Sequence, residues 1–140
     1  MDVQTEKCVM IIDEELPLGL AANTAAIMGI TLGREMPEIV GQDVTDRTGI
    51  THLGVITFPV PILKASPAAI KEIRHKLSQP EFAGVTAVDF PDLAQSSNTY
   101  EEYMDKMAAA SEEEMVYFGL ALCGAKKKVN RLVGSLPLLR

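Results

Sequence analysis

The sequence predicts an α/β fold in which a mixed four-stranded sheet is flanked by helices. Continuous apolar runs of strand length alternate along the chain with stretches of helical spacing. The connections between successive strands are long enough to be crossovers, which favours at least some parallel strand pairs. With 140 residues, of which 47% are hydrophobic and 23% charged, the chain has the composition of an average globular domain. We therefore expect one domain over residues 1–140.

The first strand and the first helix are predicted from the N-terminal third. Lys7 to Ile12 is an unbroken apolar run, and continuous hydrophobicity is typical of a strand that is covered on both faces. After a loop, Leu18 to about Ile30 follows helical spacing. Four alanines in this stretch present small surfaces that would let the helix lie close to the sheet. We expect an unusually buried helix.

The middle of the chain predicts a loop followed by an irregular strand. The apolar pattern is lost from Gly33 to Gly49, and residues 41–46 have the composition of a polar loop or short turn. The stretch from Thr51 to Leu63 is extended but contains Pro59 and Pro61. Because residues two apart direct their N–H groups to the same edge, that edge lacks two donors. The segment is therefore an edge strand, or it leaves the sheet at Phe58.

The remaining elements alternate regularly. Ser66 can cap a helix that has Pro67 at its first position and ends before Pro80. A strand over 84–90 and a polar loop over 91–97 follow, and then a helix begins with Asn98 as N-cap and Glu101 as the reaching carboxylate. That helix continues to about residue 110 with tyrosines and methionines on one side. A buried strand over 115–123 and a helix over 126–136 complete the fold.

Charge and cysteine content restrict the partners and the compartment. The net charge of −6 makes nucleic acid an unlikely main partner, because an acidic surface repels phosphate. The polar stretch from Met1 to Lys7 lacks the features of a signal peptide, and no segment has the length and apolarity of a membrane span. Cys8 and Cys123 lie in apolar strands and are predicted to be reduced core thiols. We expect a cytoplasmic protein.

Several segments resemble an uncharacterised bacterial family, a domain of unknown function whose fold is like that of type 2 peptidyl-tRNA hydrolases. The resemblance covers nearly the whole chain. It is carried by residues 7–12, 19–23, 41–44, 51–55, 59–63, 120–124 and 129–134. The resemblance implies a type 2 peptidyl-tRNA hydrolase-like arrangement of the mixed sheet and its helices.

The resemblance to the hydrolases also implies where the activities differ. The hydrolase pattern places lysines where this chain has Leu18 and Leu20, and a glutamine where it has Asn23. Those lysines meet the phosphodiester backbone, so their absence removes the charge that holds tRNA. An aspartate at the end of the third hydrolase strand has its counterpart in Asp89, after which this chain inserts a segment containing an extra helix.

Four polar residues form the candidate site. In sheet folds of this type, ligands bind beyond strand ends, where loops and helix N-termini meet. Asp89 and His52 are the candidate catalytic residues, and Asn23 and Asp43 the candidate ligand-binding residues. The structural alternative is that Asn23 caps a helix, Asp43 bonds within a turn and His52 is an ordinary strand residue. A metal site from Asp43, Asp46 and His52 matches no established spacing, so no metal or cofactor is expected.

Two functions stay open on these observations. The first is a small-molecule or peptide-binding module without catalysis, consistent with the acidic charge and the missing lysines. The second is a hydrolase that acts on a substrate other than peptidyl-tRNA. The tyrosines and methionines between Tyr100 and Met107 would pack on the sheet or on a second subunit, and we expect a homodimer.

Overall fold

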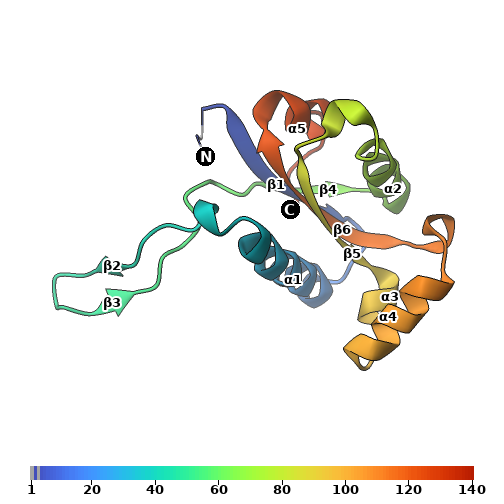
Figure 1. Ribbon diagram of the computed structural model, residues 1–140, viewed down its shortest axis with the longest axis horizontal. Coiled ribbons are helices and arrows are strands. Elements are labelled where there is room, and N and C mark those ends of the chain that lie inside the picture. The colour runs from blue at the N-terminus through green and yellow to red at the C-terminus, as the bar shows by residue number, and fades with distance from the viewer. Residues whose placement is uncertain (1, 3) are drawn as a thin grey trace.

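The computed structural model describes residue 2 and residues 4–140, and it shows a four-stranded sheet in the order β4-β1-β6-β5 (Figure 1). Residues 1 and 3 of the polar N-terminal stretch lie outside the described residues. β1 pairs in parallel with β4 and antiparallel with β6, and β5 pairs antiparallel with β6. The predicted mixed sheet is confirmed. Its strands are β1 (Glu6–Asp13), β4 (Ile62–Ala65), β5 (Thr86–Pro91) and β6 (Tyr117–Ala125).

Helices cover both faces of the sheet. α1 (Leu18–Glu35) lies on one face, and α2 (Pro67–Lys76) and α5 (Lys126–Val133) lie on the other (Figure 1). α3 (Asp92–Gln95) and α4 (Tyr100–Ala109) follow the end of β5. Short 3-10 turns span Pro37–Ile39, Pro80–Phe82 and Glu112–Glu114. In the part of the chain described here, no helix combines the length and apolarity needed to cross a membrane.

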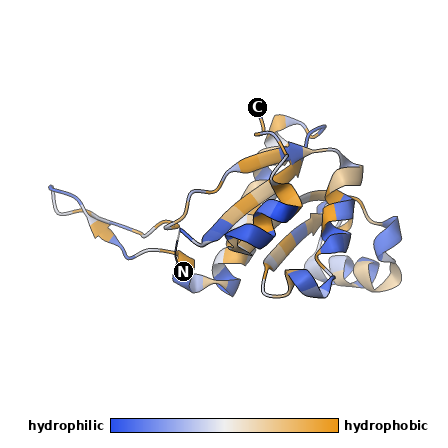
Figure 2. Cartoon of the chain, turned by 90° about the horizontal axis from the view of Figure 1, so that it is seen from above, coloured by the Kyte–Doolittle hydropathy of each residue, from blue (hydrophilic) through white to orange (hydrophobic). Residues whose placement is uncertain are grey.

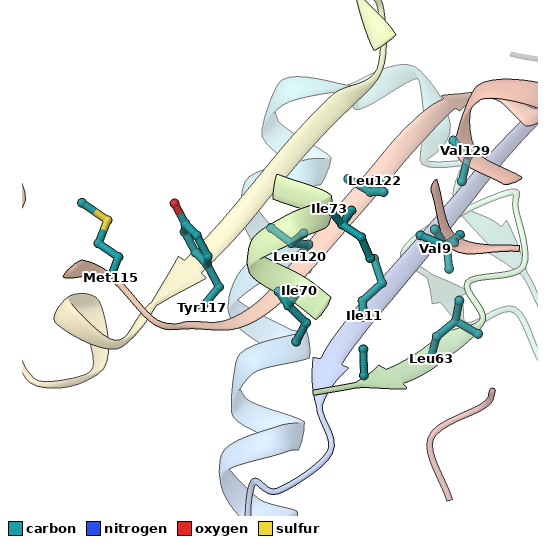
Figure 3. Close-up of a cluster of buried hydrophobic side chains, with 12 residues drawn as sticks. Val9, Ile11, Leu63, Ile70, Ile73, Met115, Tyr117, Leu120, Leu122 and Val129 are labelled. Carbon is teal, nitrogen blue, oxygen red and sulfur yellow. The ribbon is translucent and has the colours of Figure 1, made fainter. Parts of the chain in front are cut away.

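The main hydrophobic core fills the space between the sheet and the α2–α5 layer (Figure 3). β1 and β6 are buried on both faces, which explains why their sequences are continuously apolar rather than alternating. Alternate residues of β6, Leu120 and Leu122, point into this core, while Ala121 packs toward α1. Ile70 and Ile73 of α2 close the core from the other side.

α1 buries one stripe instead of the whole helix, so the expectation of an unusually buried helix is wrong. Its buried residues are Ala21, Thr24, Met28 and Leu32. Its other side faces solvent: Ile30 is 76% exposed. The close approach to the sheet depends on Gly119 of β6, because a Cβ atom there would lie 2.9 Å from side-chain atoms of both Met28 and Thr24. The small residue that allows close packing is thus on the strand.

A disulfide joins Cys8 to Cys123, so the expectation of two reduced thiols is wrong. The two residues stand directly opposite each other in the antiparallel β1–β6 pair, with Cα atoms 4.2 Å apart. This short separation is typical of the close, non-hydrogen-bonded pairs of an antiparallel ladder. The register between strands 115 residues apart brings the two sulfur atoms together, and the sequence does not reveal that register.

Residues 40–56, which we call the arm, form a projecting hairpin where a polar loop and the start of a long strand were predicted (Figure 1). Its strands are β2 (Val44–Thr45) and β3 (Thr51–His52). The turn is closed by Gly49, whose φ is +92°, and by Asp46, whose carboxylate accepts hydrogen bonds from the Thr48 and Ile50 N–H groups.

The path of the chain from the arm to β4 explains how two prolines are accommodated in this stretch. Pro59 and Pro61 lie in the irregular segment that leads from the arm to β4, outside the strands of the sheet. The expected edge strand is confined to β4 at the end of that segment. The other interpretation, in which the chain leaves the sheet at Phe58, is wrong, because the chain joins the four-stranded sheet only at Ile62, after both prolines.

The predicted helix caps are partly confirmed. Ser66 caps α2, since its hydroxyl oxygen accepts a hydrogen bond from the Ala69 N–H at 3.2 Å. The cap of α4 lies one residue later than predicted: Thr99 accepts from the Glu102 N–H, and the Glu102 carboxylate accepts from the Asn98 N–H. Thr99 is therefore the N-cap, and the Glu102 carboxylate reaches back to the residue before it. The predicted polar loop over 91–97 contains α3.

Candidate functional site

A groove runs beside β5, between α1 and the α3–α4 segment. It consists of two adjoining hollows of about 570 and about 600 Å³. Both hollows are lined by Ile27 of α1, Phe90 of β5 and Ala94 and Ser97 of the α3 segment. Because they share these side chains, the hollows form one continuous surface depression, which we call the β5 groove.

One wall of the β5 groove is a stripe of α1. The residues of this stripe are three or four apart, so they lie on one side of the helix. They are Asn23, Ile27, Thr31 and Arg34. The stripe therefore changes along its length from an amide, through an apolar section, to a guanidinium group.

The opposite wall comes from the segment that precedes α4 and from its first turn. Tyr100 and Tyr103 lie there with their rings edge to face, 5.5 Å between centroids. Burial, and then the nearby negative charge of Asp89, raises the pKa of Tyr103. Its hydroxyl has a hydrogen to donate to a ligand.

The floor of the groove is the open edge of the sheet. β5 is an edge strand, and its two sides can be assigned from the neighbouring ladder. The Met10 N–H donates to the Pro61 carbonyl on the β4 side, so Ala121, opposite Met10, directs its N–H and C=O groups toward β5. Ala121 pairs with Val88.

This assignment fixes which backbone groups of β5 point outward. Since Val88 bonds to β6, its neighbours Ala87 and Asp89 direct their N–H and C=O groups away from the sheet. Among the described residues, no hydrogen bond engages these outward groups. Ala87 is exposed and Asp89 lines the groove. The open edge of β5 beside the groove thus presents two donors and two acceptors in strand geometry.

The two charged side chains of the groove differ in how fully they are paired. The Asp89 carboxylate accepts a hydrogen bond from Arg74 of α2 at 3.0 Å, and both side chains are partly buried. Arg34 is different: its side chain is 80% exposed, and its ion pair with Glu35 is long, at 3.8 Å. Arg34 therefore keeps guanidinium donors for a ligand, whereas Asp89 already has a cationic partner.

The structure places two of the four predicted site residues at the β5 groove. Asn23 lines the first hollow and Asp89 the second. Asn23 lies inside α1, so it does not cap the helix; Pro17 stands at the N-cap and contributes no side-chain bond.

Asp43 and His52 lie elsewhere, on the arm. The Asp43 carboxylate accepts a hydrogen bond from the Gly54 N–H at 3.0 Å. His52 pairs with the Asp46 carboxylate at 2.7 Å. Hydrogen bonds from Thr48 and then from His52 hold the pKa of Asp46 well below its usual range. Both predicted residues thus take part in the arm's own hydrogen bonding, and the four residues do not meet at one point because the arm projects from the body.

Other features of the groove are not predicted from the sequence. Arg34 falls in a stretch where the apolar pattern is lost, although its spacing from Thr31 and Ile27 is a detectable helical signal. The outward backbone of Ala87 has no sequence signal, because it depends on strand order and register. In the described part of the chain, no three His, Cys, Asp or Glu side chains are grouped so as to hold a metal ion.

Comparison with a solved structure shows the same fold in another protein. A protein of unknown function, Atu0240 from Agrobacterium tumefaciens strain C58, superposes with a TM-score of 0.86 over 96% of this chain and 97% of that one. The two sequences are 16% identical, so the likeness concerns the fold. No curated protein matches the chain.

The family comparison covers almost all of the sequence. A family model described as "Protein of unknown function (DUF2000)" matches residues 6–140. The matched range contains every strand and helix of the fold, including the arm and both walls of the β5 groove. The chain therefore belongs to the DUF2000 family of proteins of unknown function.

Proposed function

We propose that this protein is a peptide-binding module without catalysis, which takes an extended peptide along the open edge of β5. One observation carries the proposal: the outward N–H and C=O groups of Ala87 and Asp89 have no partner among the described residues, and they lie beside a groove. Addition of a strand to an exposed sheet edge is a recurring mode of peptide recognition. Its affinity comes from main-chain hydrogen bonds, each contributing about 0.5–1.5 kcal/mol net.

The walls of the groove define the peptide that fits. Side chains of an added strand alternate between the two faces of the sheet, so one set meets the α1 stripe. On that side Ile27 offers an apolar surface and Arg34 an unsatisfied guanidinium. Tyr100 and Tyr103 offer rings and a hydroxyl donor at the other wall. The preferred peptide therefore combines apolar side chains with a carboxylate.

The hydrolase alternative has less support from the geometry. Catalysis by Asp89 and His52 would require both side chains near a common point. Asp89 is paired with Arg74, and His52 lies on the arm, paired with Asp46. Leu18 is 87% exposed where a lysine would meet tRNA, so nothing on this turn of α1 favours a phosphodiester.

Substitution of Ala87 by proline tests the proposal. The Ala87 N–H points outward, so proline removes a donor from the open edge and leaves the β6 ladder intact. The pyrrolidine ring also occupies the approach to the edge. We expect wild-type protein to bind members of an array of heptapeptides that combine apolar and acidic residues. The A87P variant should bind them at least about tenfold more weakly in fluorescence anisotropy.

The matched control is Ala87→Ser, which changes the same exposed position but keeps the N–H. It should bind the selected heptapeptides as wild type does, and both variants should retain the wild-type melting temperature within a few degrees. Equal affinity of the A87P and A87S variants for every selected peptide would refute binding at the β5 edge. Absence of any heptapeptide ligand at about 1 mM would refute the peptide-binding function itself.

Three wider statements belong to the same proposal. We propose a homodimer, supported by exposed apolar side chains that include Val44 and Ile50 of the arm. A type 2 peptidyl-tRNA hydrolase-like fold is supported by the mixed four-stranded sheet with helices on both faces. A cytoplasmic location remains a proposal, and the Cys8–Cys123 disulfide weighs against it, because disulfides are rare in reducing compartments.

A further inference from the structure

The arm exposes large apolar side chains that its own chain does not cover. Val44, Ile50, Leu53 and Val55 are all exposed, and Leu53 reaches 82%. Figures 1 and 2 show the arm extending away from the sheet and helices in two perpendicular views. A two-stranded hairpin of this kind is marginally stable when isolated in water. These apolar residues therefore gain most if another surface covers them.

An apolar groove lies at the root of the arm. It has a volume of about 400 Å³ and is formed by α1, the β1–β4 part of the sheet and both ends of the arm. All its lining residues are apolar or glycine: Met10, Ala25, Ala26, Gly29, Leu32, Gly33, Ile39, Val40, Ile56, Val60 and Ile62. We call it the α1 groove. It lies beside the solvent-facing Ile30 of α1, which enlarges the uncovered apolar surface.

The side of the arm that carries Val44 continues the apolar surface of the α1 groove, whereas Leu53 and Val55 lie on the other side of the ribbon. Val40 pairs with Ile56 at the root, and Val44 pairs with His52 in the same register further out. Directly opposed residues of a ribbon share a side, and so do residues an even number of positions apart. Val44 therefore lies on the side of the ribbon that carries Val40 and Ile56 into the groove. Every copy of the chain thus presents a projecting apolar ribbon and a hollow that adjoins it.

We propose that two copies of this chain exchange arms, each arm lying in the α1 groove of the other copy. The inference rests on the proposed homodimer and names its interface. A surface that contains both a projection and a hollow can close with itself about a two-fold axis, which is the commonest symmetry of soluble oligomers. The arm and the groove together offer roughly 20–30 residues a side, the number found in a standard stable interface.

Charge favours the same occupant. The tip of the arm carries Arg47, for which the described residues provide no ion pair. The end of α1 and the turn that follows it, next to the groove, expose Glu35, which pairs with Arg34, and Glu38. An incoming arm therefore brings the Arg47 cation to Glu38, which has no ion pair among the described residues, while its own carboxylates, Asp43 and Asp46, are held by hydrogen bonds within the arm. A second copy supplies both the apolar ribbon and this charge.

Two complementary variants test the exchange, with mass measured by light scattering and dissociation by sedimentation equilibrium. The V44D/I50D variant makes the arm polar, and G33R places a long charged side chain at the groove; a Cβ at Gly33 meets nothing within 4 Å, so the side chain starts without a clash. We expect wild-type protein at twice the 15.2 kDa of one chain. Each variant should raise the dimer dissociation constant about 100-fold.

A mixture of the two variants gives the sharper test. The V44D/I50D variant has an unaltered groove, and the G33R variant has an unaltered arm. In a heterodimer the unaltered arm can lie in the unaltered groove, so one of the two contacts is kept. A homodimer of either variant keeps neither contact. We expect the equimolar mixture to form heterodimers at concentrations where each variant alone is monomeric. Ala22→Arg, a charge placed on the exposed side of α1 outside the groove, is the matched control and should leave the dimer intact.

The outcomes separate the two proposals. A wild-type monomer at about 1 mM would overturn both the homodimer and the arm exchange. A wild-type dimer that persists in V44D/I50D and G33R, or a mixture that forms no heterodimer, would overturn arm exchange while the homodimer stands. Circular dichroism of each variant establishes that it is folded. Binding of heptapeptides at the β5 edge is measured separately and fails or succeeds on its own.

Discussion

Removal of the Cys8–Cys123 disulfide is expected to lower the free energy of unfolding by about 4–5 kcal/mol. The cross-link joins residues 115 apart, so it restricts most of the unfolded chain. Both cysteines are completely buried between β1 and β6. Urea unfolding of the C8A/C123A variant, followed by circular dichroism, measures the loss. A smaller part of it comes from the lost packing of the sulfur atoms.

The reduced wild-type protein is the control for this prediction. It retains both side chains and lacks only the bond, so the difference between reduced and oxidised protein isolates the cross-link. Thiol titration in denaturant should find no free thiol before reduction and two afterwards. Identical unfolding midpoints for the oxidised and reduced forms would contradict a stabilising disulfide.

Substitution of Gly119 by valine is expected to cost about 3 kcal/mol of stability and to displace α1. A Cβ at this position would lie 2.9 Å from the Met28 and Thr24 side chains and 3.0 Å from the Ile11 carbonyl oxygen. Met28 can change rotamer, but the Thr24 side chain is held against the helix by the hydrogen bond that its hydroxyl donates to the Leu20 carbonyl oxygen. The helix must therefore move away from the sheet. Thermal unfolding measures the cost, and heptapeptide affinity should fall because α1 is a wall of the β5 groove.

The control for this substitution is Gly33→Val on α1 itself. A Cβ there meets nothing within 4 Å, so the substitution adds the same atoms without a clash. It should change the stability by less than about 1 kcal/mol. Equal effects at Gly119 and Gly33 would contradict close packing of α1 on β6 as the source of the loss.

The elements of the body follow from local patterns in the sequence. β1 and β6 are recognised because strands buried on both faces read as unbroken apolar runs. The Ser66 cap and the proline after it specify the start of α2 through backbone chemistry alone. These features are local, so no knowledge of the register is needed. The mixed α/β class follows from their alternation.

The disulfide and the arm were harder to predict from the sequence. The disulfide depends on the pairing of distant strands, and the arm depends on a short turn signal within a polar stretch. The Cys8–Cys123 pair exists because of the β1–β6 register, which single-strand patterns do not contain. The arm does have a local signal, since Asp46 and Gly49 together make the hairpin turn. The polar residues around the turn resemble an ordinary loop. The two strands of the arm are only two residues long, so they show no recognisable strand pattern.

The candidate site divides in the same way. Asn23 and Asp89 are predictable as polar residues near strand ends and a helix start, and both line the β5 groove. Asp43 and His52 have the same residue types, but their hydrogen bonds belong to the arm. The outward direction of the Ala87 N–H and C=O groups depends on the order of the strands and on which residues of β5 bond to β6. Only the three-dimensional structure reveals both.

Amide hydrogen exchange, measured by NMR with and without a bound heptapeptide, tests edge binding most directly. Without peptide, the Val88 amide should be protected by its bond to β6, while those of Ala87 and Asp89 exchange rapidly. Addition of a saturating heptapeptide should slow exchange at Ala87 and Asp89 at least about tenfold, as expected for amides that gain a hydrogen bond. A peptide that binds while both amides exchange at their original rates would contradict an added strand on β5.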